Sequence, residues 1–446
     1  MSVIHLTSAV KLPPAKFLTL SFALLIAVGS ILLWMPWSSA SRTTSYIDAL
    51  FTATSAVCVT GLITLNTATH WSFVGKAIIL LLIQAGGLGV MTVATLFAFV
   101  MGKRIGLKQR ILIQEALGQL TLSGVVRLTR HILLVTAIIE GFGAFLLTLR
   151  FLAQMPPLQA LWYGVFHAVS AFCNAGFDIF GDSLVRFVTD PLVNFVVTGL
   201  IITGGIGFTV IAELYQYFTS KERLSLHSKL VLKVTVFLIL SGTILVWLLE
   251  RTNQDTIAGL GIPGQLLASY FQSVTARTAG FNTIDISAIR PATALILICL
   301  MFIGASPGGT GGGIKTSTAA VIVAAVYAMA AGKSEVEISE RRIPTGIVLK
   351  AMGIATISAC LVTSVAIGLS VFQRAQTLPI VFETVSAFGT VGLSMGITSE
   401  LTALGKLLII LTMFAGRVGP LTLAMAIVAD TNHTTVKHPE EKVIVG

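Results

Sequence analysis

Four stretches of the sequence are versions of one motif: SAVCVTGL (residues 55–62), SAFCNAGF (170–177), VTARTAGF (274–281) and SAFGTVGL (386–393). Each contains a glycine followed by Leu or Phe, and an aromatic residue stands at the same distance before each of these glycines. A second glycine-centred phrase follows each copy, beginning at Gly86, Gly204, Gly304 and Gly416. Because this register is kept through four copies, the chain contains an internal repeat of about 110 residues.

The composition is that of an integral membrane protein. Of the 446 residues, 55% are hydrophobic and only 11% are charged, and the mean hydropathy is +0.91. Soluble domains carry about 25% charged residues. The four cysteines form no CxxC pair, so the sequence predicts neither a disulfide framework nor a zinc site. The net charge of +10 comes from basic residues in loops between apolar segments, which indicates membrane topology rather than nucleic-acid binding.

Each repeat has the same expected order of elements: a long apolar span, a shorter helix, the glycine motif and a second span. The shorter helix cannot cross a hydrocarbon core of about 30 Å. The first apolar run could be a signal peptide, but its length matches a span and the repeat requires it. The expected segments are 17–35, 46–57 and 78–101; 133–152, 159–171 and 193–217; 230–249, 264–275 and 292–331; and 347–372, 378–388 and 405–429.

The predicted fold class is an all-α membrane protein with eight transmembrane helices and four pore half helices around one central pore. Lys and Arg are in excess in the two tails and in the loops 103–130, 221–233 and 333–350. Both termini are therefore predicted to be cytoplasmic, and the motifs to enter from the outer face. The expected divisions are repeat 1 (1–110), repeat 2 (111–220), repeat 3 with a gate loop (221–335), repeat 4 (336–430) and a cytoplasmic C-terminal tail (431–446).

The repeated motif has the chemistry of a cation filter. A half helix that ends inside the membrane points the negative end of its dipole, about half an elementary charge, at what lies beyond it. The residues that follow carry no carboxylate, so backbone carbonyls must coordinate the ion, and glycine permits the positive φ that turns them toward one axis. The predicted ion-binding residues, with K⁺ as the bound metal ion, are Val59, Thr60, Gly61, Asn174, Ala175, Gly176, Thr278, Ala279, Gly280, Thr390, Val391 and Gly392.

This plan of span, half helix, motif and span resembles the Trk/Ktr/HKT superfamily of cation transporters. The resemblance covers residues 16–429, and the motifs of residues 166–177, 273–282 and 389–393 look most like those of KtrB-type membrane subunits of bacterial Ktr potassium uptake systems. It implies a K⁺ pathway in the bacterial plasma membrane, because K⁺-selective members have glycine in all four filters and some Na⁺-conducting relatives have serine in the first. This chain has Gly61 there.

The glycine-rich run of the third repeat is predicted to be a gate. It cannot stay helical, since Gly costs about 1 kcal/mol and Pro about 3 kcal/mol in a helix interior. It is also close to a nucleotide-binding P-loop, but Ile314 stands where that motif needs glycine. The matching stretch of Ktr-like proteins is an intramembrane gate, and a passive linker is the alternative. The predicted gate residues are Gly304, Ala305, Ser306, Pro307, Gly308, Gly309, Thr310, Gly311, Gly312, Gly313, Ile314 and Arg417.

Three basic residues lie in or beside the motifs. Arg417 is in the middle of the last apolar run, where a charge costs about 2.5 kcal/mol or more. The resemblance places it near the gate loop, to bind loop carbonyls or repel cations, and a structural arginine at a helix end is the alternative. Arg277 is a candidate to stabilise filter backbone, and Lys315 to lie at the cytoplasmic edge.

The prediction is a K⁺ uptake protein, channel-like or a symporter, and not an enzyme. A Na⁺ uniporter of the same fold and a purely structural membrane subunit are the alternatives. No cofactor is expected in this chain, and Na⁺ is left open as an activating ion. The resemblance implies a homodimer on a cytosolic nucleotide-binding ring of the KtrA type. The tail 433–446 ends in Val443-Ile444-Val445, which suits a contact surface, with a disordered tail as the alternative.

Overall fold

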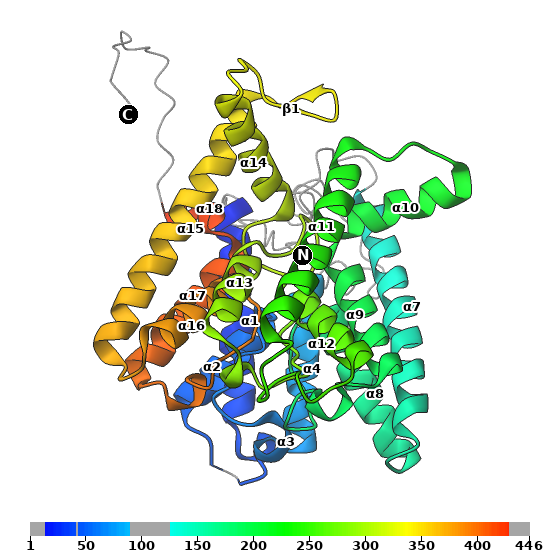
Figure 1. Ribbon diagram of the computed structural model, residues 1–446. Helices are drawn as coiled ribbons and strands as arrows, with labels where there is room; N and C mark the ends of the chain where they lie inside the picture. Colours follow the sequence, from blue (N-terminus) through cyan, green and yellow to red (C-terminus); the bar gives the residue numbers. More distant parts are fainter. Residues whose placement is uncertain (1–13, 42, 90–124, 428–446) are drawn as a thin grey trace, which may run out of the picture.

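The computed structural model describes residues 14–41, 43–89 and 125–427 (Figure 1). Three predicted features lie wholly or partly outside these residues: the second half of the expected span 78–101, most of the loop 103–130, and the tail 431–446. The described part is mostly helical, as predicted.

The same order of three helices occurs four times. The long helices are α1 (Pro14–Trp34), α7 (Val125–Phe151), α11 (Leu226–Glu250) and α15 (Thr345–Phe372). Each is followed by a shorter helix that ends at the glycine motif: α2 (Tyr46–Val57), α8 (Pro157–Phe172), α12 (Ile262–Thr275) and α16 (Thr377–Gly389). A third helix comes next: α4 (Phe73–Leu88), α9 (Pro191–Gly205), α13 (Pro291–Phe302) and α17 (Ala403–Val418). The predicted half helices are thus confirmed as helices, close to their expected bounds.

The remaining elements connect these helices. They are α3 (Thr67–His70), α10 (Phe208–Ser220), α14 (Thr316–Ala330), α18 (Pro420–Ile427) and the 3₁₀ turns Pro36–Ser38, Val185–Phe187, Ile286–Ala288 and Thr398–Glu400. A two-stranded antiparallel hairpin of β1 (Glu337–Ile338) and β2 (Arg341–Arg342) departs from the all-α prediction. Figure 1 shows the hairpin, α10 and the end of α14 on one face of the molecule and α3 on the opposite face.

The third helix of each set is interrupted, as the second glycine phrases predict. Helices α9 and α10 meet at an angle of 102°, and a loop separates α13 from α14. Among the described residues, four helices are long and apolar enough to cross a membrane alone, or five if the bent pair is one span. The number of eight spans therefore stays a prediction.

Local sequence explains where several helices begin. The Ser45 hydroxyl accepts from the backbone N–H of Asp48 at the start of α2, and Thr402 accepts from Gly405 at the start of α17. Such side chains satisfy N–H groups that have no partner in the first turn. Helices α9, α12 and α13 carry proline in their first turn, where the missing N–H costs nothing.

Contacts between the sets close a ring. Helix α4 packs against α8, α9 against α12, α13 against α16, and α17 against α2. The third helix of each set thus contacts the half helix of the next set, and the fourth set contacts the first. Aromatic residues of the half helices fill the packed interior, since Phe51, Phe166 and Phe382 are fully buried. The half helices are consequently held on several sides, with the motifs at their C-terminal ends.

Candidate functional site

The four motif glycines lie against one another. A Cβ built on Gly61 would lie 2.5 Å from the carbonyl oxygen of Ala175 and 3.1 Å from Cα of Gly176. Each of the other three glycines approaches the next motif in the same way. The approaches run from Gly61 to Ala175, from Gly176 to Ala279, from Gly280 to Val391 and from Gly392 back to Thr60. The motifs therefore form a closed ring of four, in which no glycine has room for a side chain.

Each motif has two residues in the left-handed region. The motif glycines have φ between 67° and 96°, and the residue two positions earlier is also left-handed in every copy: Val59 at 51°, Asn174 at 57°, Thr278 at 77° and Thr390 at 49°. For β-branched Val and Thr this conformation is an outlier, and such strain is concentrated at functional sites. The strain recurs at one register position in all four copies, which makes it a property of the motif and not of one loop.

Hydrogen bonds within each copy hold the motif on its own half helix. The N–H of Thr60 donates to the carbonyl of Ser55 at 2.8 Å, and Ala175 and Val391 make the equivalent bonds to Ser170 and Ser386 at 2.8 Å each. In the third copy Ala279 donates to Thr275 at 2.9 Å. The N–H groups are therefore directed back at the helix ends. Backbone carbonyls are the groups that remain to face a cation.

The second glycine phrases lie against the ends of the half helices. A Cβ on Gly86, Gly204 or Gly416 would overlap the carbonyl oxygen of the residue four positions before the motif glycine, which is Val57, Phe172 or Phe388 respectively. Glycine is required here because the helix end occupies the space of a side chain. The two glycine phrases that the sequence repeats together are thus in contact in space.

The glycine-rich loop of the third set lies against one end of the ring. A Cβ on Gly312 would be 2.5 Å from Oγ1 of Thr390, and one on Gly311 would overlap Oγ1 of Thr278. The N–H of Gly312 donates to the Thr390 hydroxyl at 2.9 Å. Thr278 and Thr390 are the first residues of their motifs. The loop therefore covers the end of the ring that is nearest the half helices.

The loop is held mainly by residues of other sets. Ser306 N–H donates to the carbonyl of Gly205 at 2.9 Å, and Thr310 N–H donates to that of Gly204 at 3.1 Å. The Thr310 hydroxyl donates to the carbonyl of Phe172 at 3.2 Å. At its base the loop closes on itself, where Gly304 N–H donates to Ile314 at 2.8 Å. The broken end of α9 is thus the main support of the loop.

Arg417 joins the loop to the first and fourth sets. Its guanidinium donates to the carbonyl of Thr310 in the loop, to that of Gly86, and to that of Gly87 at 3.2 Å. The expectation that Arg417 binds loop carbonyls is therefore met by the geometry. The alternative of an arginine at a helix end is met as well, because Gly86 and Gly87 lie in the last turn of α4.

The other two basic residues behave differently. Lys315 Nζ donates to the carbonyl of Gly311 at 2.7 Å, so this side chain folds back on the loop instead of reaching an edge. Arg277 is 8% exposed, and its Nε has no hydrogen-bond partner among the described residues. It lines a small gap beside Gly205, Thr235 and Ala305. The structure thus gives no hydrogen bond between Arg277 and filter backbone.

One buried acid near the ring was missed in the sequence. Glu383 lies in α16 and is fully buried, and its carboxylate accepts from the hydroxyls of Ser394, at 2.7 Å, and Thr398. The signal that could have found it is an ionisable residue inside an apolar segment, directly after the aromatic residue that the repeat places before each motif.

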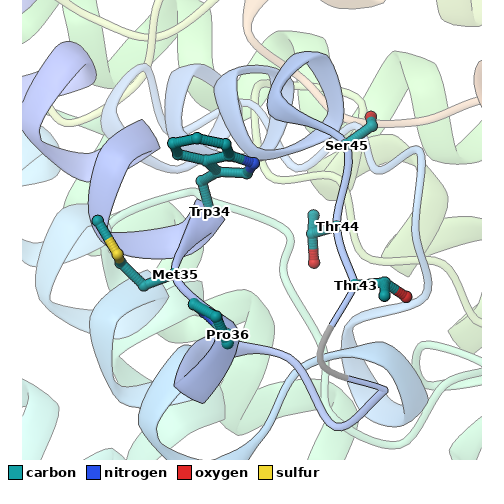
Figure 2. Close-up of a pocket in the computed structure, with 6 residues that line it drawn as sticks. All are labelled: Trp34, Met35, Pro36, Thr43, Thr44 and Ser45. Atoms are coloured by element: carbon teal, nitrogen blue, oxygen red, sulfur yellow. The ribbon is translucent and has the colours of Figure 1, made fainter.

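A surface pocket elsewhere plays no part in this arrangement. It has a volume of about 640 Å³ and lies where α1 gives way to the α1–α2 connection. Figure 2 shows Trp34 and Pro36 on one side of it and Thr43, Thr44 and Ser45 on the other. None of its lining residues belongs to a motif or to the loop.

Comparisons with known proteins agree with this geometry. The model of the TrkH family, described as cation transport protein, matches residues 15–435. The chain is 44% identical over 437 residues to Ktr system potassium uptake protein B of Bacillus subtilis, covering 98% of each chain. It is 40% identical over 448 residues to the potassium/sodium uptake protein NtpJ of Enterococcus hirae, again covering 98% of each.

A solved structure shows the same fold. The crystal structure of the potassium transporter TrkH from Vibrio parahaemolyticus superimposes with a TM-score of 0.74 at 16% identity, covering 96% of this chain and 87% of that one. The family match extends over nearly the whole sequence, and these relatives are transporters and not enzymes. The chain belongs to the TrkH family of cation transport proteins.

Proposed function

We propose that this chain takes up K⁺ across the bacterial plasma membrane through the ring of four motifs. The observation that carries the proposal is the closed ring itself, with eight left-handed residues and N–H groups turned back toward the half helices. Carbonyls then replace the hydration shell of the ion. Non-helical backbone at membrane depth is tolerated where it is buried in protein or lines an aqueous cavity, which fits this segment.

In this proposal, eight spans surround the ring. The four long helices supply one span each, and each interrupted third helix with its continuation supplies another. Both termini are then cytoplasmic and the loop lies on the cytoplasmic side of the filter. Accessibility of single cysteines placed in the connections, for example at Thr69 and at Ser339, tests the orientation. Labelling of both from the same side would contradict it.

The loop of residues 304–314, with Arg417, is proposed to be the gate. It covers one end of the ring through Gly311 and Gly312, and Arg417 links it to two other sets. A positive charge at this place also opposes the passage of cations while the loop is closed. Opening requires the loop to give up these contacts.

Flux measurements test the function. Purified protein in liposomes should carry K⁺ and Rb⁺ in preference to Na⁺. Absence of cation flux would favour a structural subunit. Equal flux of Na⁺ would favour the second candidate, a Na⁺-conducting transporter, which the name of the Enterococcus hirae relative supports. The same assay with added Na⁺ shows whether Na⁺ activates K⁺ uptake.

We also propose a homodimer that docks on a separate cytosolic nucleotide-binding subunit. Support comes from the relatives named as parts of a Ktr system. The ring is complete within one chain, so a dimer is not needed to build it. Removing residues 439–446 and measuring the mass in detergent tests whether the tail holds the dimer. If ATP and ADP leave flux through the assembled complex unchanged, the proposal of nucleotide control fails.

A further inference from the structure

The four half helices differ in charge at one equivalent position. The residue directly after the aromatic that precedes each motif is Thr52, His167, Phe271 or Glu383, and each of these is buried. Only the fourth can carry a negative charge. A carboxylate in the fourth half helix therefore breaks the near-equivalence of the four copies, on the side where the fourth set meets the first.

A pocket lies on that side, at the opposite end of the motifs from the loop. It has a volume of about 190 Å³ and is open to the exterior. Its lining comes from the first set, with Gly61 and Leu62, and from the fourth, with Gly392, Ser394 and Thr398. Since a water molecule takes about 30 Å³ of liquid, this space holds an ion together with much of its hydration shell.

Glu383 lies directly behind this pocket and orients its hydroxyls. The Ser394 and Thr398 hydroxyls donate to the two carboxylate oxygens, and Gly396 N–H donates to Ser394 Oγ at 3.0 Å. An ionised carboxylate can only accept, so it takes the hydroxyl hydrogens and leaves oxygen lone pairs for the pocket. The pocket thus presents oxygen acceptors with a negative charge behind them.

We propose that this pocket binds a partly hydrated monovalent alkali cation before it passes into the filter, with Glu383 supplying the charge. The proposal rests on the proposed function, because the site would deliver ions to the ring. A monovalent ion is favoured over Ca²⁺, since Ca²⁺ sites use six to eight oxygens, with carboxylates in direct contact. Here the carboxylate is fully buried and reaches the pocket only through hydroxyls.

The first test replaces Glu383 by Gln and measures K⁺ uptake into liposomes over a range of K⁺ concentrations. The concentration at half-maximal uptake should rise about three- to tenfold, as expected for losing one charge several ångströms from the ion. The K⁺/Na⁺ selectivity should not change. A matched control is Glu250→Gln, since Glu250 is equally buried but accepts from Thr293, Thr256, Asn253 and Arg290, none of which lines the pocket.

A second pair of variants decides the question if the Glu383 variant does not fold. Ser399 is exposed and lines the pocket. Ser399→Lys should raise the half-saturating concentration, while the neutral Ser399→Gln should leave it unchanged. Equal behaviour of the two, or an unchanged concentration in Glu383→Gln, would overturn the cation site. Failure of the filter assignment looks different, because it appears as unchanged selectivity in Gly61→Ser.

Discussion

The filter ring and the loop beside it are both rich in glycine, but they are held in different ways. Each motif of the ring is bonded to its own half helix, through pairs such as Thr60 with Ser55. The loop is bonded mainly to other sets, through Gly204, Gly205, Thr390 and Arg417. A segment held by its own helix keeps its shape when neighbours move. A segment held by several other elements can be released when they shift, which suits a gate.

The strongest test of this difference is deletion of residues 305–313. K⁺ flux should rise at least about 30-fold, because the anchors that keep the loop closed are together worth roughly 2 kcal/mol or more. Selectivity for K⁺ over Na⁺ should persist, since the ring does not depend on the loop for its own hydrogen bonds. Loss of flux in a protein that is still folded and assembled would show that the loop is structural.

Gly61→Ser tests the ring from the other side. The K⁺/Na⁺ selectivity should fall about tenfold, since a side chain in the left-handed region costs roughly 1–2 kcal/mol and this one would also meet the Ala175 carbonyl. Gly332→Ser is the matched control, because Gly332 also has a positive φ, of 64°, but has open space around it. Unchanged selectivity in well-folded Gly61→Ser protein would refute the filter.

Arg417→Gln should raise flux about fivefold, because roughly 1 kcal/mol is lost when a charged donor is replaced by a neutral one. Arg417→Lys keeps the charge but cannot reach Thr310, Gly86 and Gly87 as a planar fork, so it should have an intermediate effect. Flux measured at fixed protein density in liposomes checks both. A fall in flux for Arg417→Gln would indicate that the arginine supports the open pathway instead.

The smallest effect is expected for Thr390→Val, which removes the acceptor of the Gly312 N–H. Flux should rise about threefold, since one hydrogen bond contributes roughly 0.5–1.5 kcal/mol. Thr390→Ser keeps the hydroxyl and should behave like the parent protein. If Val and Ser at this position give the same flux, the bond between the filter and the loop does not help to keep the loop closed.

The sequence by itself determined the repeat, the half helices and the positions of the breaks. These features are local: apolar length sets a helix, and glycine and proline end it, so the half helices are found close to the expected ranges. Arg417 was also identified as a partner of the loop, because the resemblance to known cation transporters placed it there and a charge in an apolar run needs one.

Only the tertiary structure decided how the four copies meet. The sequence does not show that each motif glycine lies against the next copy, or that Gly86, Gly204 and Gly416 make room for helix ends. It gave no sign that Lys315 turns back to Gly311, that Arg277 has no bond to the filter, or that Glu383 stands behind a pocket. These contacts join residues far apart in the chain, and they depend on the packing of helices and not on local propensity.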